Sequence, residues 1–378
     1  MDASVNDLAR AYASAETMRA IAMTDFPKIG HVAEQLEMVT VPVPRPAHDE
    51  VAIKLSASTI HIDEIYVAQG TALGRFYGPK KVSASDPYIL GSTVSGTVVG
   101  LSKEVDRFQI GNDVIVIPNE KAAEHDSWAT YRCVTQKMVM LKPKELSHNQ
   151  AAAITLAGCV AKGAIDTAGA RAGDRCLVVG ASGAIGLLNI QFLKALGAHV
   201  TAVCSGKNAE LVKAKGADEV IDYTKHRFCE LPEVKASPFD IVFDNIGGRE
   251  VEEDASKALK KSGKFVTIVG PVRYIGEQKL SWPKVIKVIG YVLWRMLSTK
   301  FGRGPRYLFS LKFPRLVIAG TMNEIVRHGV AMPTETVVPF ELEPIRSAVQ
   351  LVSTHRARGR VLIDFTGTNA LQDNAASK

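Results

Sequence analysis

The sequence predicts an α/β fold in which a doubly wound parallel sheet is combined with a second, β-rich domain that is split along the chain. Strand and helix patterns alternate between residues 147 and 311, which is typical of βαβ units and of a parallel sheet covered on both faces. Short alternating strands punctuated by prolines occupy residues 19–146. A helical pattern and two more strands, at 336–340 and 360–365, are expected to return to the β-rich domain.

These patterns divide the 378 residues into five expected segments. Residues 1–18 are an N-terminal extension, and residues 19–146 are the first part of the β-rich domain. Residues 147–311 are the parallel-sheet domain, and residues 312–366 are the second part of the β-rich domain. The polar residues 367–378 are expected to form a disordered tail. A chain of this length can bury two cores.

The most informative segment is 176–186, where a short apolar run ends in three glycines at three-residue intervals and an apolar helical pattern follows. Strand, glycine turn and helix together are the context of a Rossmann dinucleotide site. The first glycine permits the turn, the second lets a pyrophosphate approach the backbone, and the third lets helix and strand pack closely. The helix N-terminus favours phosphate. The candidate cofactor-binding residues here are Gly180, Ala181, Ser182, Gly183, Ala184, Ile185 and Gly186.

The end of the second strand, near residue 204, indicates which nicotinamide cofactor binds. An NAD site carries Asp or Glu there to accept hydrogen bonds from the ribose 2′-hydroxyl, and this chain has none at that point. A lysine supplies positive charge instead, so we predict NADPH; the alternative is an ordinary solvated loop lysine. The candidates for this half of the cofactor, including the ends of the later strands, are Ser205, Lys207, Asn208, Tyr223, Asn245 and Val269.

Composition narrows the class of protein. Hydrophobic residues make up 46% of the chain and charged residues 22%, as in soluble globular proteins. Five cysteines are scattered singly, which favours reduced thiols, and the acidic N-terminus has no apolar signal region. We therefore expect a cytoplasmic protein. A peripheral association with a membrane stays open as well, because of the basic segment described next.

Positive charge is concentrated in one segment. Residues 279–315 carry nine Lys and Arg and no Asp or Glu, in a chain whose net charge is +7. No nucleic-acid-binding module accompanies this charge, so we predict no nucleic-acid partner. Residues 282–300 read as a helix with one polar stripe on an otherwise apolar surface. It is too charged for a membrane span, which leaves a lid or core helix, a subunit contact, or a helix lying on a membrane surface.

Several motifs together resemble the medium-chain dehydrogenase/reductase superfamily, in its zinc-free quinone oxidoreductase branch. They include residues 60–70, 90–100, 180–186 and 216–223, and the resemblance covers about residues 18–365. It implies a split GroES-like catalytic domain, a Rossmann domain, an intervening cleft and a homodimer.

The same resemblance bears on metal binding. Zinc-using relatives place a cysteine at the position of His61 and a Gly-His-Glu sequence at the position of Gly91, Ser92 and Thr93. A catalytic zinc needs three protein ligands, and His61 alone does not supply them. We therefore predict no zinc and no other metal.

Without a Lewis acid, hydride transfer to an already electrophilic carbonyl compound is favoured over alcohol oxidation. The predicted function is an NADPH-dependent reductase of a small-molecule quinone or α,β-unsaturated carbonyl. The resemblance places Tyr66 near the nicotinamide, either as a hydrogen-bond donor or as an aromatic wall without a proton role. His61 is the candidate to orient the nicotinamide, the alternative being a packed or water-bonded histidine. Tyr77, in the loop over residues 71–88, is a rival donor. Two alternatives stay open: an enoyl-thioester reductase, and a weakly catalytic NADPH-binding protein of a membrane surface or complex.

Overall fold

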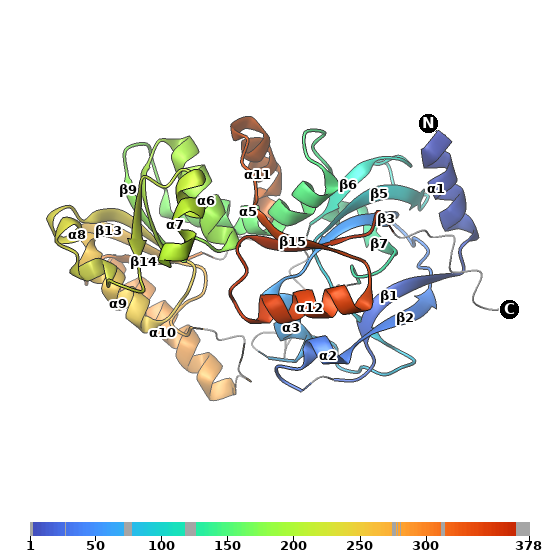
Figure 1. Cartoon of the computed structure of the whole chain (residues 1–378), viewed down its shortest axis with the longest axis horizontal. Helices are drawn as coiled ribbons and strands as arrows, with labels where there is room; N and C mark the ends of the chain where they lie inside the picture. The colour runs from blue at the N-terminus through green and yellow to red at the C-terminus, as the bar shows by residue number, and fades with distance from the viewer. Residues whose placement is uncertain are drawn as a thin grey trace. The chain divides into compact units, whose positions relative to one another are not determined.

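The computed structural model describes residues 3–26, 28–71, 78–117, 126–273, 277, 279, 281–310 and 314–367. The chain forms two compact units. The first contains Met1–Leu156 and Thr334–Lys378, and the second contains Ala157–Pro333. Figure 1 traces both units in the order of the chain.

The second unit is built on a six-stranded sheet whose strand order is β11-β10-β9-β12-β13-β14, with every pair parallel. The order reverses between β9 and β12, which is the arrangement of a doubly wound Rossmann sheet. This confirms the predicted fold class. The strands are β9 (Arg175–Val179), β10 (His199–Cys204), β11 (Glu219–Asp222), β12 (Phe239–Asp244), β13 (Leu259–Thr267) and β14 (Arg306–Phe309).

Helices connect these strands, and two of them show why the local sequence forms them. In α5, Ser147 caps the N-terminus: its Oγ accepts from the Gln150 N–H at 3.2 Å, and Gln150 Oε1 accepts from the Ser147 N–H at 2.8 Å. Helix α6 ends at Gly197, whose φ of +87° suits a glycine. The helices are α5 (His148–Ala168), α6 (Ala184–Leu196), η2 (Gly206–Asn208), α7 (Ala209–Ala214), η3 (Phe228–Glu230), α8 (Pro232–Ala236), α9 (Arg249–Ala258), α10 (Trp282–Lys300) and α11 (Pro314–His328).

The first unit contains a seven-stranded sheet and a three-stranded sheet. The C-terminal strand β16 pairs antiparallel with β3, with Leu362 opposite Thr59, so the domain is split as predicted. The strands are β1 (Thr17–Met23), β2 (Leu36–Pro42), β3 (Glu50–Thr59), β4 (Tyr88–Ile89), β5 (Val94–Leu101), β6 (Asp113–Val116), β7 (Tyr131–Thr135), β8 (Val139–Leu141), β15 (Thr334–Pro339) and β16 (Arg360–Asp364).

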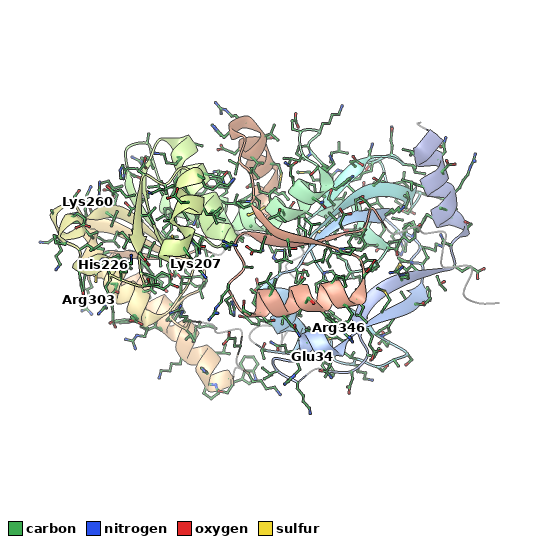
Figure 2. The ribbon with its side chains drawn as sticks, in the orientation of Figure 1. Glu34, Lys207, His226, Lys260, Arg303 and Arg346 are labelled. Carbon is green, nitrogen blue, oxygen red and sulfur yellow. The ribbon has the colours of Figure 1, made fainter. Side chains whose placement is uncertain are left out.

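Short helices complete the first unit. Arg346 of α12 donates to the Leu36 carbonyl at 2.7 Å and to the Glu34 carbonyl at 3.4 Å, so the C-terminal helix is tied to the N-terminal part of the chain (Figure 2). The helices are α1 (Ala3–Ser14), α2 (Val32–Gln35), α3 (Ile62–Ala68), η1 (Gln136–Met138) and α12 (Leu342–Ser353).

Two expected segments differ from the structure. The extension over 1–18 contains α1, which packs on the first unit through Tyr12; this side chain is buried, and its hydroxyl donates to the Pro44 carbonyl at 2.7 Å. The boundary expected at residue 312 lies too early, because α11 belongs to the second unit. Gln191 of α6 exchanges two hydrogen bonds of 3.0 Å with Ala331, just after α11.

The tail beyond residue 367 lies outside the described residues. Within them, α5 is long and apolar enough to cross a membrane by length and composition, but 72% of its most apolar window is buried inside the protein. A core helix passes the same test.

All five cysteines are free, and four of them are buried: Cys159, Cys176, Cys204 and Cys229. Burial raises the pKa of the Cys159 and Cys176 thiols to about 12 and that of Cys204 to about 11. These thiols therefore stay protonated at neutral pH.

Candidate functional site

The predicted glycine turn lies at the carboxyl end of β9, where the strand order reverses. Gly180 has a φ of +73°, and the Ala181 N–H donates to the Val203 carbonyl at 3.1 Å, which joins the turn to β10. Gly183 is the N-cap of α6. Ligands of doubly wound sheets bind outside the carboxyl ends of the strands at this reversal.

The three glycines differ in the space around them. A Cβ at Gly183 would meet only the Gly180 carbonyl oxygen, at 3.5 Å, so this part of the turn is open to a ligand. A Cβ at Gly186 would lie 2.4 Å from the same oxygen and 2.7 Å from the Ala181 Cα. The open side of the turn and the free N–H groups of α6 fit a pyrophosphate.

Asn208 and Asn245 hold the turn rather than project freely. Asn208 is buried, and its Nδ2 donates to Ser182 Oγ at 3.0 Å. Asn245 Nδ2 donates to the Val179 carbonyl at 3.1 Å. The buried Oδ1 of Asn208 has no hydrogen-bond partner among the described residues, so it is the atom of this side chain left for a ligand donor. Its amide nitrogen donates one of its two N–H groups to Ser182, so a role of Asn208 as a hydrogen-bond donor to the phosphate stays a prediction.

The carboxyl ends of β12 and β13 are joined by Asp244, which sequence reasoning missed. This buried carboxylate accepts from the N–H groups of Ile246 and Gly247, both at 2.9 Å, and from Thr267 Oγ1 at 2.8 Å. Burial raises the pKa of Asp244. Thr267 Oγ1 also accepts from the Val269 N–H at 3.2 Å, so the loops bearing Asn245 and Val269 are fixed together.

The residues predicted to read the 2′-phosphate lie on the η2 turn and after β11. Lys207 is exposed and forms no hydrogen bond or ion pair with a described residue (Figure 2). The side chain of Tyr223 is 62% exposed. Asp222, at the end of β11, approaches Gly206: a Cβ there would lie 2.5 Å from Asp222 Oδ2. Its Oδ1 accepts from Thr224 Oγ1 at 2.7 Å, and hydrogen bonds from Thr224 lower the pKa of Asp222.

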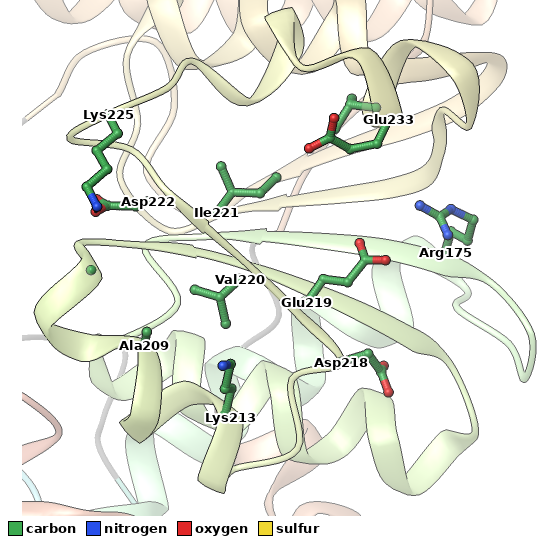
Figure 3. Close-up of a pocket in the computed structure, with 12 residues that line it drawn as sticks. Arg175, Ala209, Lys213, Asp218, Glu219, Val220, Ile221, Asp222, Lys225 and Glu233 are labelled. Carbon is green, nitrogen blue, oxygen red and sulfur yellow. The ribbon is translucent and has the colours of Figure 1, made fainter.

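A hollow of about 590 Å³ lies along the edge strand β11, and Figure 3 shows the residues that line it. Gly206, Asp222 and Lys225 line it near the carboxyl end of the strand, and Arg175 and Asp218 line it near the other end. It therefore borders the predicted phosphate-reading turn but contains none of the predicted catalytic residues.

In the first unit, His61 is the N-cap of α3 and its ring is buried. Arg360 Nη1 lies 2.9 Å from His61 Nδ1, and Thr59 Oγ1 lies 2.5 Å from Nε2. A guanidinium only donates, so Nδ1 is the acceptor and Nε2 carries the proton. Burial, with the charge of Arg360 second, lowers the pKa of His61 well below its usual value. Both ring nitrogens therefore have partners within the first unit, and the expectation that His61 orients the nicotinamide stays a prediction.

Glu64 connects α3 to the loop before β5. Its Oε1 accepts from the Ser92 N–H and from Ser92 Oγ, both at 2.7 Å, and its Oε2 accepts from the His61 N–H at 3.1 Å. Burial raises the pKa of Glu64 to about 7, although these hydrogen bonds oppose the shift. His61 and Ser92 stand where zinc-using relatives have metal ligands, and here Glu64 ties them together.

Tyr66, on α3, has a partner that sequence reasoning missed. Its hydroxyl lies 3.2 Å from Nε2 of His355, which is exposed and has a φ of +55°. Left-handed backbone is unfavourable for a residue with a side chain, although histidine adopts it more readily than most. In the sequence, the one sign that pointed to His355 is its position just before the strand predicted at 360–365. Tyr77 lies outside the described residues.

No group of three or more His, Cys, Asp or Glu side chains that could hold a metal ion occurs in the part of the chain that the structure describes. That part is residues 3–26, 28–71, 78–117, 126–273, 281–310 and 314–367.

A Rossmann sheet with an open glycine turn, in a chain with a split β-rich domain, defines a two-domain dinucleotide-binding protein. Comparison with known families gives the same result. Residues 47–144 match the alcohol dehydrogenase GroES-like domain, and residues 215–363 match the family described as zinc-binding dehydrogenase. The chain belongs to the medium-chain dehydrogenase/reductase superfamily and is quinone-oxidoreductase-like.

Similar proteins are oxidoreductases by name. The chain is 32% identical over 331 residues to the mitochondrial NAD(P)H oxidoreductase RTN4IP1 of Bos taurus, covering 84% of this chain and 82% of the relative. It is 30% identical over 353 residues to 2-methylene-furan-3-one reductase of Solanum lycopersicum, covering 92% and 79%. The quinone oxidoreductase structure from Coxiella burnetii aligns with a TM-score of 0.74 at 23% identity, over 92% and 99%. These relatives support an oxidoreductase with a nicotinamide cofactor.

The different surroundings of Gly183 and Gly186 give a first prediction. Gly183→Ala should fold with nearly unchanged stability, because its backbone conformation suits alanine, but its methyl group should weaken cofactor binding at least about 10-fold. Gly186→Ala should lose about 1–3 kcal/mol of unfolding free energy, because the methyl group would overlap backbone atoms. Chemical denaturation and cofactor titration measure the two effects.

Gly320→Ala on α11 is the matched control, since nothing lies within 4 Å of a Cβ there. It should leave cofactor binding unchanged and raise the unfolding free energy by about 0.5–1 kcal/mol, because alanine is a better helix former than glycine. If Gly183→Ala binds the cofactor normally, the cofactor does not approach this turn.

The raised pKa of Glu64 gives a second prediction. The folded pKa, about 7, lies above the roughly 4.3 of an unfolded chain, so the folded protein holds a proton that the unfolded chain releases. The stability from this group is therefore fully present below about pH 4 and lost as pH rises through 7. Glu64→Gln cannot titrate, so its stability deficit should shrink by about 2 kcal/mol between pH 5 and pH 8.

Urea unfolding across this pH range measures the deficit, and Glu37→Gln, at an exposed position of the same unit, is the control. A deficit of Glu64→Gln that stays constant with pH would contradict the assignment.

Proposed function

We propose that the protein is a zinc-independent, NADPH-dependent reductase of quinones or α,β-unsaturated carbonyl compounds. The observation that carries the proposal is the state of His61. At the position where zinc-using relatives have a cysteine ligand, both of its ring nitrogens are engaged, by Arg360 and by Thr59. No lone pair remains for a metal, and a substrate carbonyl must therefore be activated by its own conjugation and by hydrogen-bond donors.

The preference for NADPH rests on the η2 turn. Lys207 is exposed with its charge unpaired by any described residue, and Ser205 and the exposed Tyr223 lie on neighbouring loops. The nearby carboxylate of Asp222 accepts hydrogen bonds from Thr224 and lies 3.9 Å from Lys225, so its charge is partly balanced. A 2′-phosphate would gain charge-assisted hydrogen bonds from Lys207.

The bound cofactor supplies a hydride, and Tyr66 is proposed to act at the other end of the substrate. Its hydroxyl donates to the carbonyl oxygen, where negative charge develops as hydride arrives, and then transfers its proton. His355 lies 3.2 Å from the same hydroxyl and is exposed, so it can return a proton to Tyr66 from water. The substrate thus gains one hydride and one proton.

Localisation and assembly stay predictions. Five free cysteines agree with a reducing compartment, and the bovine relative is mitochondrial by name. We propose a reducing intracellular compartment and a homodimer; gradient fractionation and sedimentation would test them.

The cofactor assignment predicts the effect of Lys207→Ala. Removing the charge should raise the KM for NADPH about 10-fold and leave the KM for NADH unchanged, because only NADPH carries the 2′-phosphate. Steady-state kinetics with both cofactors measure this. Lys261→Ala, at another exposed lysine of the second unit, should alter neither value. A wild-type protein with higher kcat/KM for NADH would overturn the NADPH assignment.

The chemical assignment predicts the effect of Tyr66→Phe. Turnover of a benzoquinone and of a conjugated enone should fall about 100-fold while cofactor affinity is kept, because a proton donor is lost. Tyr307→Phe is the control, since that buried hydroxyl has no hydrogen-bond partner among the described residues.

The same assay should include an enoyl thioester and a saturated ketone. Reduction of the thioester alone would favour the enoyl-thioester reductase instead. No NADPH oxidation with any acceptor would contradict the proposed function, and unchanged turnover of Tyr66→Phe would remove Tyr66 from the chemistry.

A further inference from the structure

We propose that α10 is a docking surface for a membrane containing anionic lipids, on which the helix lies flat. The orientation of the helix supports this, because its polar side faces the protein and its apolar side faces outward. Figure 1 shows α10 running past α9 and the edge strand β14. An ordinary surface helix turns its apolar face to the core and its polar face to water.

The inner face of α10 is held by polar contacts. Tyr291 donates its hydroxyl hydrogen to Glu252 Oε2 of α9 at 3.0 Å, and Arg295 forms an ion pair with the other oxygen of that buried carboxylate. Thr299 is buried, and its Oγ1 accepts from the Tyr307 N–H of β14 at 3.0 Å. Val292 packs against the core between them.

The outer face of α10 is apolar. Ile286, Ile289, Leu293 and Leu297 are 65%, 53%, 55% and 58% exposed, and their spacing of three or four residues places them on one side of the helix. Large side chains extend this face at both ends and on its two flanks, and all are exposed: Trp282, Trp294, Met296 and Phe301. The amphipathic pattern is therefore reversed, and a contiguous apolar patch of this kind marks an interaction site.

The charge of the segment around α10 indicates which kind of partner covers its apolar face. The segment 279–315 has nine basic residues and no acidic one, and Lys287 and Lys300 are exposed on the helix itself. Two copies of this segment in a two-fold contact would bring like charges together, and the segment itself contributes no acidic partner. Anionic headgroups complement the lysines, and the apolar side chains reach the acyl boundary, as in interfacial helices. Because Arg295 is fixed to Glu252, the helix cannot turn its inner face into lipid.

Vesicle flotation of the full chain tests this inference. The protein should float with phosphatidylcholine vesicles that contain phosphatidylglycerol and not with phosphatidylcholine alone, and high salt should weaken binding. The double variant Leu293→Asp, Leu297→Asp should lower the bound fraction at least about 10-fold. Leu141→Asp is the matched control: this leucine is 54% exposed, lies in the first unit, and should leave flotation unchanged.

Tryptophan emission gives a second readout. Trp282 and Trp294 are exposed on α10, whereas Trp128 is completely buried. Anionic vesicles should therefore shift the emission to the blue, and Trp294→Phe should reduce the shift. NADPH oxidation by the variants checks that they are folded.

Two results would overturn the proposal. One is absence of flotation and of a spectral shift with anionic vesicles in a protein that is folded. The other is conversion of a dimer to a monomer by the double variant without an effect on lipid binding, since the face would then be a subunit contact.

Discussion

The structure of the candidate cofactor site depends on the close approach of α6 to the turn that precedes it. Gly186 lies so near the Gly180 carbonyl that even a methyl group would overlap it. This contact directs the helix N-terminus to the place where the strand order reverses, with its N–H groups turned outward. The hydrogen bonds around it, from Asn208 to Ser182 and from Asn245 to Val179, keep the turn in one conformation.

In the first unit, hydrogen bonds join polar side chains inside and beside the core. His61 and Glu64 are buried and Arg360 is half-buried, and each is bonded to another member of the group or to a neighbouring hydroxyl. Burial lowers the pKa of Arg360 to about 10 and raises that of Glu64 to about 7. Removing one partner would leave another unsatisfied, so this group fixes α3, and with it Tyr66, as a unit.

Local patterns in the sequence were enough to predict the parallel sheet and the glycine turn, because the alternation of strands and helices and the glycine spacing are local features. The split domain joins distant residues, such as Leu362 and Thr59, and was predicted from the family resemblance. Contacts between distant residues were not predictable: Tyr66 and His355 meet across 289 positions, and Glu64 and Ser92 across 28. The contact of Asn208 with Ser182 was not predicted for the same reason, since it joins residues 26 positions apart. The helix α1 was also missed, and its packing through the buried Tyr12 is a contact with residues distant in the chain.

The chemistry of the cysteines suits the proposed substrates. Quinones and enones are electrophiles that alkylate sulfur, and the thiolate is the reactive form. In this protein four thiols are shielded, and the pKa of three of them is raised to about 11 or 12. A reductase that handles such compounds would thereby resist inactivation by its own reactants without needing a scavenger.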